Sequence, residues 1–303
     1  MHNLGKKEDP MDYWEKANHS WSTDSLRYIN TSTQKQRELF YYIQEIGYFK
    51  ASKPYFTERE NLPSYLIKYT LSGCGELRYK GKSYQLKAGD VFFIDCLDYQ
   101  YYHTVSQEPW EMDWIHLYGA NVAAFYDEFL KNGSPVFHTN PASSRQNPIH
   151  LVLQDLLMLQ PEPNAKTAFQ SSVLIHQLLN ELLLQKYHLD FSDSEIPPYI
   201  LQIRDQLEED FRQGITLESL EERYHINKYQ IVKEFSKYMG LPPIEYQISK
   251  HISYSKDLLR YSRLSIKEIS LAIGIENTAY FSRLFKKKGG ISPSDYRQTE
   301  NGR

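Results

Sequence analysis

The sequence contains little cysteine, with only Cys74 and Cys96 among its 303 residues. Two cysteines exclude a disulfide scaffold and a cysteine-rich zinc site. Long hydrophobic runs are also missing: segments such as 91–94 are far shorter than the roughly 20 residues that a membrane span needs. No apolar segment follows the basic residues near the N-terminus, so we expect no secretory signal, no membrane contact and a cytoplasmic location.

The chain has no strong excess of one charge, but its two ends differ. The formal net charge is −3. Residues 1–196 contain 18 Lys and Arg against 24 Asp and Glu, whereas residues 197–303 contain 17 against 14. A length of 303 residues fits two domains of about 100–200 residues each. The acidic N-terminal part and the basic C-terminal part favour two separate domains, and if the chain binds a polyanion, we expect the C-terminal domain to do so.

Short runs with alternating polarity fill the region from about residue 40 to residue 117. Lys80-Gly81 supplies a hairpin turn within segment 76–86. Strands that alternate with turns every 8–12 residues predict a small antiparallel barrel or sandwich. Residues 1–35 are polar and read as an arm without a core of its own. The predicted strands are 64–71, 76–86, 91–94, 99–104 and 111–117.

Helical periodicity begins after Gly119, in segments 123–130, 149–159 and 171–184. Leu174, Leu178 and Leu182 form an apolar stripe, which either packs on the strand domain as core or pairs two subunits. Both alternatives stay open at this point. The predicted organisation is an arm (1–35), a strand domain (36–140), a helical dimerisation region (141–188), a linker (189–198) and a C-terminal helical domain (199–299).

The C-terminal region contains an internal repeat with an offset of 50 residues. Such a repeat of glycine, proline and aromatic positions predicts a duplicated helix-turn-helix unit. The first copy has Ile231, Phe235, Gly240, Leu241, Pro243 and Tyr246, and the second has Phe281, Phe285, Gly290, Ile291, Pro293 and Tyr296.

Each copy contains the signals of a helix that can read DNA. In the second copy Ser265 and Glu268 form a capping box, Gly274 occupies the turn, and Asn277 caps a helix that runs to about Lys288. The first copy has His225 at the turn, so we expect either left-handed backbone strain or a rearranged turn there. The outward residues expected to contact DNA are Thr278, Ala279, Ser282, Arg283, Lys286 and Lys287 in the second copy, and Tyr229, Val232 and Lys233 in the first.

These residues resemble the C-terminal signature of the AraC/XylS family of transcription regulators. The resemblance covers about the last 90 residues and is densest in segment 265–297, SIKEISLAIGIENTAYFSRLFKKKGGISPSDYR. It implies two helix-turn-helix units joined by a long helix over about 243–261. Segments 65–75, 81–94 and 110–119 resemble the cupin-like effector domains of the sugar-responsive members. The implied fold class is α+β: an antiparallel cupin-like β-barrel with following helices, then an all-α double helix-turn-helix domain.

The same resemblance implies an effector site inside the barrel. Tyr102 and Trp114 fall on sugar-contacting positions, and Arg59 lies near a sugar-binding arginine. Strand alternation places Gln100 on the face of Tyr102, and Met112 on the face of Trp114. The alternative is that these side chains only fill the interior. No cluster of basic residues accompanies these candidate effector residues, so we expect a neutral sugar rather than a phosphate.

An enzymatic barrel is the rival interpretation from another class. Catalytic cupins bind a metal through a close histidine pair and further ligands, but segment 40–117 contains only His103 and His116. We therefore expect no metal, no cofactor and no catalytic residues.

The predicted function is a ligand-responsive activator of carbohydrate genes. Its expected partners are double-stranded DNA, a small-molecule effector expected to be a sugar, and a second copy of the chain. The other alternative is a regulator without a small ligand, controlled by a protein partner.

Overall fold

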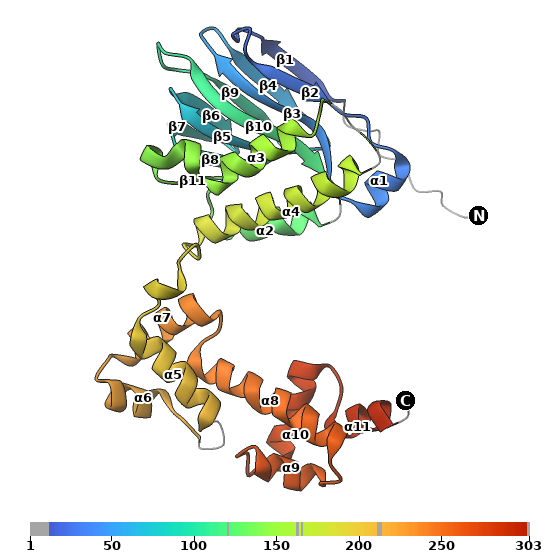
Figure 1. Ribbon diagram of the computed structural model, residues 1–303, viewed down its shortest axis with the longest axis vertical. Helices are drawn as coiled ribbons and strands as arrows, with labels where there is room; N and C mark the ends of the chain where they lie inside the picture. Colours follow the sequence, from blue (N-terminus) through green and yellow to red (C-terminus); the bar gives the residue numbers. More distant parts are fainter. Residues whose placement is uncertain (1–11, 120, 162–163, 165, 211–213, 302–303) are drawn as a thin grey trace, which may run out of the picture. The chain divides into compact units, whose positions relative to one another are not determined.

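The computed structural model describes residues 12–119, 121–161, 164, 166–210 and 214–301 (Figure 1). The chain divides into two compact units, Met1–His188 and Leu189–Arg303. The N-terminal unit contains the predicted strands and the first helices, and the C-terminal unit is helical. None of the described helices is long and apolar enough to span a membrane.

The N-terminal unit is built from two antiparallel sheets that pack face to face. The predicted barrel is not closed: the structure has two separate sheets, so the sandwich alternative holds, with a broadly cupin-like arrangement. The first sheet has the order β1 (Trp14–Asn18), β4 (Phe56–Glu60), β9 (Gln100–Thr104), β6 (Gly75–Tyr79), β7 (Lys82–Leu86). The second has the order β11 (Val136–His138), β8 (Asp90–Asp95), β5 (Tyr65–Ser72), β10 (Trp110–Tyr118), β3 (Tyr42–Ala51), β2 (Leu26–Ile29).

The described part of the expected N-terminal arm belongs to this sandwich. Strand β1 pairs with β4 and strand β2 pairs with β3, so each sheet gains an edge strand from residues 12–35. Trp21 stacks on Phe49, with ring centroids 4.3 Å apart. An edge strand needs few apolar residues, so the polar composition of residues 12–35 did not predict these two strands. Residues 1–11 of the expected arm lie outside the described residues.

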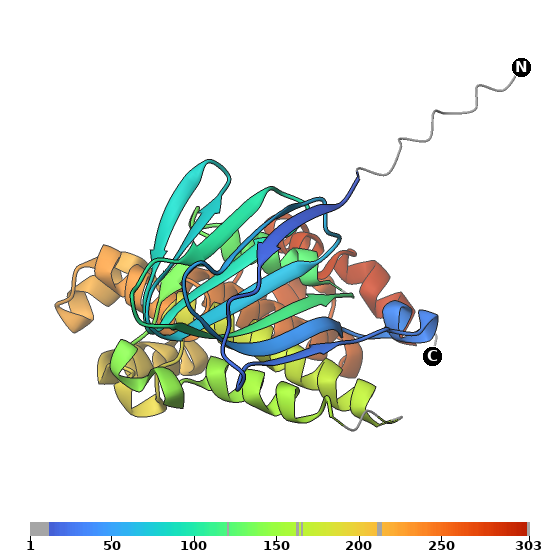
Figure 2. The same cartoon turned by 90° about the horizontal axis from the view of Figure 1, so that it is seen from above.

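The six-stranded sheet is buried on both of its faces. One face packs on the five-stranded sheet through side chains such as Leu66 and Phe92, and the other packs on helices through Ile67 and Phe93. Figures 1 and 2 show the helices on one side of the sheets. Successive side chains of a strand point to opposite faces, so β5 and β8 contribute to both cores. The helices of this unit are α1 (Gln34–Leu39), α2 (Val122–Leu130), α3 (Pro148–Met158) and α4 (Thr167–Lys186).

The leucine stripe on α4 is part of the core. Leu178 and Leu182 are both 0% exposed, and Leu174 is partly buried against the same cluster. The core alternative is therefore correct, and the proposal that this stripe pairs two subunits is wrong. The stripe faces the six-stranded sheet because that sheet exposes a second apolar face that must be covered.

The C-terminal unit contains the two predicted helix-turn-helix units. The first is α6–α7, the second is α9–α10, and α8 joins them over the predicted residues. Each unit has its own small core, around Phe235 in the first and around Phe281 and Phe285 in the second. The helices are α5 (Pro198–Glu209), α6 (Leu217–Tyr224), α7 (Lys228–Met239), α8 (Pro243–Tyr261), α9 (Ile266–Ala272), α10 (Thr278–Gly289) and α11 (Pro293–Asn301).

Residues 189–198, expected to be a linker, belong to the C-terminal unit. The Phe191 ring packs on Tyr238 of α7, with centroids 4.7 Å apart, and Ile196 packs on the first core. Ser192 and Glu195 form a capping box around a short helical turn. This segment therefore has fixed contacts within its unit, which its acidic and proline-rich composition did not indicate.

The turns of the two helix-turn-helix units follow the predicted backbone chemistry. Ser265 accepts from the backbone N–H of Glu268, which confirms the capping box. Gly274 has φ +78°, and the equivalent His225 has φ +54°. Both residues are left-handed, a conformation that costs a residue with a Cβ atom about 1 kcal/mol. The first unit therefore contains backbone strain that the second avoids.

We expect His225→Gly to stabilise the C-terminal unit by up to about 1 kcal/mol, because glycine removes the strain of the left-handed residue. The matched change Gly274→Ala should destabilise it by a similar amount. Hydrogen exchange of the α7 and α10 amides in the full chain measures both effects. Equal protection in the native protein and the two variants would contradict this account of the turns.

We expect Leu178→Glu to unfold the N-terminal unit, since a carboxylate buried without a partner costs several kcal/mol. Val173→Glu on the same helix is the control, because Val173 is 67% exposed. Thermal denaturation should show a large loss of stability for the first variant and little change for the second. A folded Leu178→Glu protein that has only become monomeric would restore the subunit-pairing interpretation.

Candidate functional site

A small cavity lies between the two sheets of the N-terminal unit. Its volume is about 30 Å³. A water molecule needs roughly 10–15 Å³ on this measure, so the cavity holds about two waters. The five-stranded sheet contributes Arg59 and Tyr102, the six-stranded sheet contributes Lys68 and Trp114, and the N-terminal strand β1 contributes Glu15.

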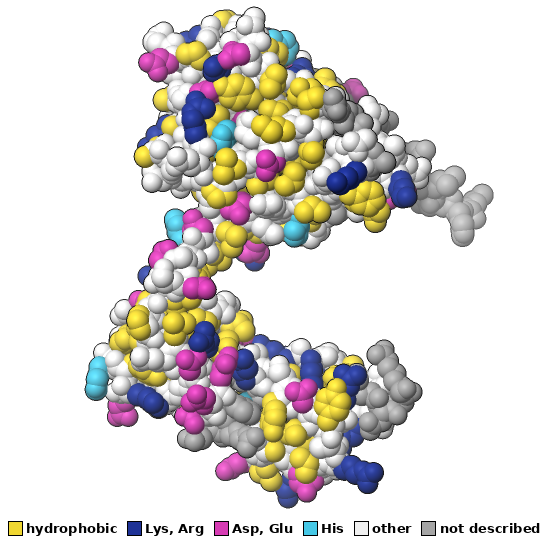
Figure 3. Space-filling model, in the orientation of Figure 1, with side chains coloured by type: hydrophobic (Ala, Val, Ile, Leu, Met, Phe, Trp, Pro, Cys, Tyr) yellow, Lys and Arg dark blue, Asp and Glu magenta, His cyan; other side chains and the backbone are white. Residues whose placement is uncertain are grey.

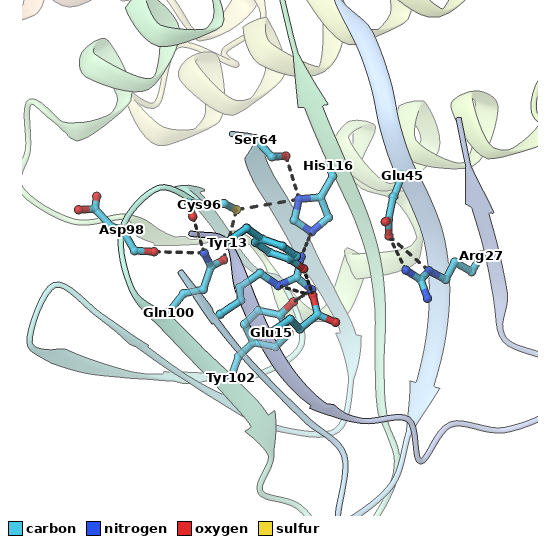
Figure 4. Close-up of polar contacts among 11 residues, drawn as sticks. Tyr13, Glu15, Arg27, Glu45, Ser64, Cys96, Asp98, Gln100, Tyr102 and His116 are labelled. Atoms are coloured by element: carbon cyan, nitrogen blue, oxygen red, sulfur yellow. Dashed lines mark hydrogen bonds and ion pairs between the residues drawn. The ribbon is translucent and has the colours of Figure 1, made fainter. Parts of the chain in front are cut away.

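Arg59 is the central hydrogen-bonding group of the cavity. It stands on β4 directly opposite Glu15 of β1, so the two side chains share one face of the sheet. The Arg59 Nε atom lies 3.3 Å from the Glu15 Oε2 atom, and its Nη2 group donates to the Tyr102 hydroxyl at 3.3 Å. Its Nη1 atom lies 3.0 Å from Nε2 of His116. Figure 4 shows Glu15, Tyr102 and His116 pointing toward one another from three strands.

His116 is a neutral partner for the guanidinium. Burial, together with the charges of Arg59 and Lys68, holds the pKa of His116 well below its ordinary value. Arg59 has no acceptor of its own, so it donates to Nε2 of a neutral ring. The Nδ1 atom of His116 lies 2.9 Å from the Ser64 hydroxyl, which fixes the ring between the two groups.

Lys68 is a buried cation in the same cavity. It stands on β5 and is 2% exposed. Its Nζ atom lies 3.9 Å from the centroid of the Tyr102 ring, 5.1 Å from Trp110 and 5.8 Å from Tyr55. Among the described residues it has no hydrogen-bond or ion-pair partner. Burial, reinforced by the charge of Arg59, lowers the pKa of Lys68 well below its ordinary value.

Trp114 forms an apolar wall of the cavity beside Lys68. The two residues are directly opposite each other in the β5–β10 pairing. The indole lies against Gly47 of β3, where a Cβ atom would come within 2.7 Å of Trp114 Cζ2, so only glycine leaves room for it. The buried indole Nε1 atom has no hydrogen-bond partner in the part of the chain that the structure describes.

The structure brings together three of the five expected effector residues. Arg59, Tyr102 and Trp114 line the cavity. Gln100 and Met112 do not line it, and the expectation that they would is corrected. The Gln100 amide turns away and donates to the backbone oxygens of Cys96 and Asp98, whereas Met112 is fully buried in the core between the sheets.

Sequence reasoning missed Lys68 and therefore the charge of the cavity. The signal was a lysine between Leu66 and Thr70 at alternate positions of a strand whose inner face is buried. The described lining contains three basic side chains and two carboxylates: Arg27, Arg59 and Lys68 against Glu15 and Glu45. The statement that no cluster of basic residues is present is thus wrong for this site, because residues distant in the sequence assemble it.

The described residues contain no group of three or more His, Cys, Asp and Glu side chains placed to hold a metal ion.

Asp113, next to Trp114 in sequence, points to the other face of the sheet, as its position on the strand predicts. There it contacts His150 and Gln154 of α3 at 2.5 and 2.7 Å. It therefore serves the packing of α3 rather than the cavity.

The second feature of interest is the exposed side of helix α10. Asn277 caps its start by accepting from the Tyr280 N–H, and Phe281 and Phe285 anchor the opposite side at 0% exposure. Ala279, Arg283, Lys286 and Lys287 are exposed, and Thr278 and Ser282 are partly exposed. The Ser282 hydroxyl donates to the Thr278 carbonyl at 2.9 Å.

Helix α7 presents the equivalent side in the first unit. Asn227 caps it by accepting from the Tyr229 N–H, and Ile231 and Phe235 face the core. Tyr229 is 75% exposed. Lys233 is exposed and Val232 is partly exposed.

Positive charge alone does not mark one surface of the C-terminal unit. Figure 3 shows Lys and Arg side chains at several places on the face in view, with acidic side chains among them. Lys288 of the α10 lysine triplet forms an ion pair with Glu245 at 2.7 Å, so one of the three charges is already partnered. The helix-turn-helix geometry, and not net charge, therefore indicates the DNA-reading surface.

Comparisons with known proteins match both units. A helix-turn-helix domain family matches residues 220–299, and an AraC-like ligand binding domain family matches residues 43–183. The Msm operon regulatory protein of Streptococcus mutans is 25% identical over 80% of this chain and 86% of its own length. The lactose operon transcription activator of Staphylococcus xylosus is 26% identical over 77% and 83%, and the arabinose operon regulatory protein of Escherichia coli is 24% identical over 80% and 84%.

The fold, the cavity and the matched domains define a transcription regulator with a ligand-binding unit and a double helix-turn-helix unit. The chain belongs to the AraC family of transcription regulators. The comparisons thus confirm the predicted family, and the prediction of a regulator rather than an enzyme.

Proposed function

We propose that this protein is a cytoplasmic activator of carbohydrate-uptake or catabolism genes, and that a sugar binds in the cavity of the N-terminal unit. The observation that carries the proposal is the cavity itself: aromatic walls and buried donors lie in a ligand-binding unit of a chain that ends in two DNA-reading helices. Relatives named for sugar operons support the carbohydrate class.

The cavity offers the two kinds of contact that a sugar requires. The Trp114 indole presents a flat apolar wall for the C–H face of a sugar ring, and Arg59 and the Tyr102 hydroxyl present hydrogen-bonding groups for its hydroxyls. The Trp114 Nε1–H group, which has no hydrogen-bond partner among the described residues, is a further donor for a sugar oxygen.

A sugar is much larger than the two waters for which the cavity has room. Glu15, His19 and Trp21 all come from the N-terminal segment and line one side of the cavity. Strand β1 lies at the edge of the five-stranded sheet, so its displacement breaks the pairing with one neighbour, β4, and the Glu15–Arg59 ion pair. We infer that effector binding displaces this segment.

The small cavity also favours one alternative, a regulator that binds no small molecule. In that case the Arg59–Glu15 pair is a permanent part of the core, and a protein partner controls activity. An unchanged thermal midpoint across a panel of mono- and disaccharides would support this alternative.

We also propose that the protein is a homodimer, through a surface different from the one expected. Leu151 and Met158 lie seven residues apart on α3 and are 50% and 76% exposed, and Val173 on α4 is 67% exposed. Figure 3 shows hydrophobic side chains on the face that these helices form. Two copies could bury this surface in an isologous contact.

For DNA recognition, Arg283→Ala should selectively weaken binding to the operator. Arginine near the start of a recognition helix pairs with guanine in a contact worth about 1–3 kcal/mol. Lys287→Ala is the matched control: it should weaken operator and random DNA alike and reduce the salt dependence. Titrations at several salt concentrations measure both effects, and equal loss on operator and random DNA for Arg283→Ala would refute the role given to Arg283.

For effector binding, Trp114→Phe should weaken the sugar affinity about tenfold, because it removes the indole donor and part of the flat wall. Tyr101→Ala is the control, since Tyr101 is the neighbour of Tyr102 on the opposite face of β9. Isothermal titration measures the affinities, and unchanged operator binding shows that the C-terminal unit is intact. Equal sugar affinity in Trp114→Phe and native protein would place the effector elsewhere.

A further inference from the structure

We propose that the effector is an acidic sugar whose carboxylate binds between Lys68 and Arg59. The proposal rests on the proposed sugar-sensing function and defines its ligand class. It replaces the neutral sugar expected from the sequence, because that expectation did not include Lys68.

The cavity contains buried hydrogen-bond donors without acceptors. Trp114 Nε1 and Arg59 Nε are buried without a hydrogen-bond partner among the described residues, although Arg59 Nε faces the Glu15 carboxylate at 3.3 Å. The Lys68 side chain is 2% exposed and makes no ion pair within the described residues. Buried donors are normally satisfied, so the unpartnered indole N–H of Trp114 beside the unpaired Lys68 side chain indicates a missing acceptor. A carboxylate accepts only, and its two oxygens can serve several donors at once.

The charges around the cavity leave one cation without a counterion. Arg27 pairs with Glu45 at 2.9 Å, and Arg59 lies 3.3 Å from Glu15. Lys68 has no ion pair among the described residues, and its Nζ atom lies over aromatic rings. An uncompensated buried ammonium is costly, and a carboxylate beside it removes most of that cost. The burial that lowers the pKa of Lys68 would then be opposed by the ligand's charge.

A single negative charge fits this site better than a double one. Lys68 is the one Lys or Arg side chain of the described lining that lacks an ion pair, and the single charge of a carboxylate would balance it in its protonated form. A phosphate ester would bring a second negative charge close to the Glu15 carboxylate, which already faces Arg59. The rest of the ligand is a sugar rather than a bare acid because Trp114 and the Tyr102 and Thr57 hydroxyls line the same cavity.

The test is isothermal titration of the full chain with four sugars. D-Galacturonate, D-galactose and D-galactose 6-phosphate share one ring configuration and differ in charge, and D-glucuronate is the C4 epimer of D-galacturonate with the same charge. Lys68→Met removes the ammonium and keeps the length of the side chain. Lys82→Met is the matched control, because Lys82 is an exposed lysine on β7 of the same unit. Thermal denaturation verifies folding, and Lys68→Met should be at least as stable as the native protein without ligand.

We expect one or both uronates to bind, and Lys68→Met to weaken that binding roughly 10- to 100-fold while Lys82→Met leaves it unchanged. Galactose should bind Lys68→Met and native protein equally weakly. Three results would overturn the inference while leaving sugar sensing in place: tighter binding of galactose than of the uronates, tighter binding of the phosphate, or uronate affinity unaffected by Lys68→Met. Absence of binding by all four sugars would defeat both the inference and the sugar class.

Discussion

Lys68 lies in a protein interior where its Nζ atom faces three aromatic rings. Glu15 and Glu45 line the same cavity, but among the described residues Lys68 makes no ion pair with either. This arrangement follows from the burial of the six-stranded sheet on both faces. Strand β5 must place every second side chain between the sheets, and at that position the sequence has lysine instead of an aliphatic residue. A fold that needed only stability would not use a lysine there, so the energetic cost of this residue is the strongest indication that the cavity serves a ligand.

The C-terminal unit could be predicted closely because its signals are local. The Ser265–Glu268 capping box, Asn277 and the left-handed Gly274 each act within a few residues of the chain, and the structure has them as expected. For His225, aligned with Gly274 in the repeat, the sequence left open a left-handed residue or a rearranged turn, and the structure has the left-handed residue. Helix α8 begins and ends at the predicted residues, since proline starts it and the second unit follows directly.

The cavity could be predicted only in part because it is assembled from distant segments. Tyr102 and Trp114 were accessible through strand alternation and the family resemblance. Glu15 was not, because its strand is short, polar and at the edge of a sheet. Lys68 was hidden inside a strand that was correctly predicted, since a single strand does not reveal that both of its faces are buried. The same long-range burial decided that the α4 leucine stripe is core.

We propose that occupation of the cavity changes how the chain binds its operator. Such coupling is reciprocal, and the factor by which effector changes DNA affinity equals the factor by which DNA changes effector affinity. The direct measurement is the operator affinity of the full chain by fluorescence anisotropy, with and without a saturating sugar that binds the cavity. We predict a change of at least about fivefold, which in Lys68→Met requires a uronate concentration about 10- to 100-fold higher. The same operator affinity with the cavity filled and empty would contradict the claim.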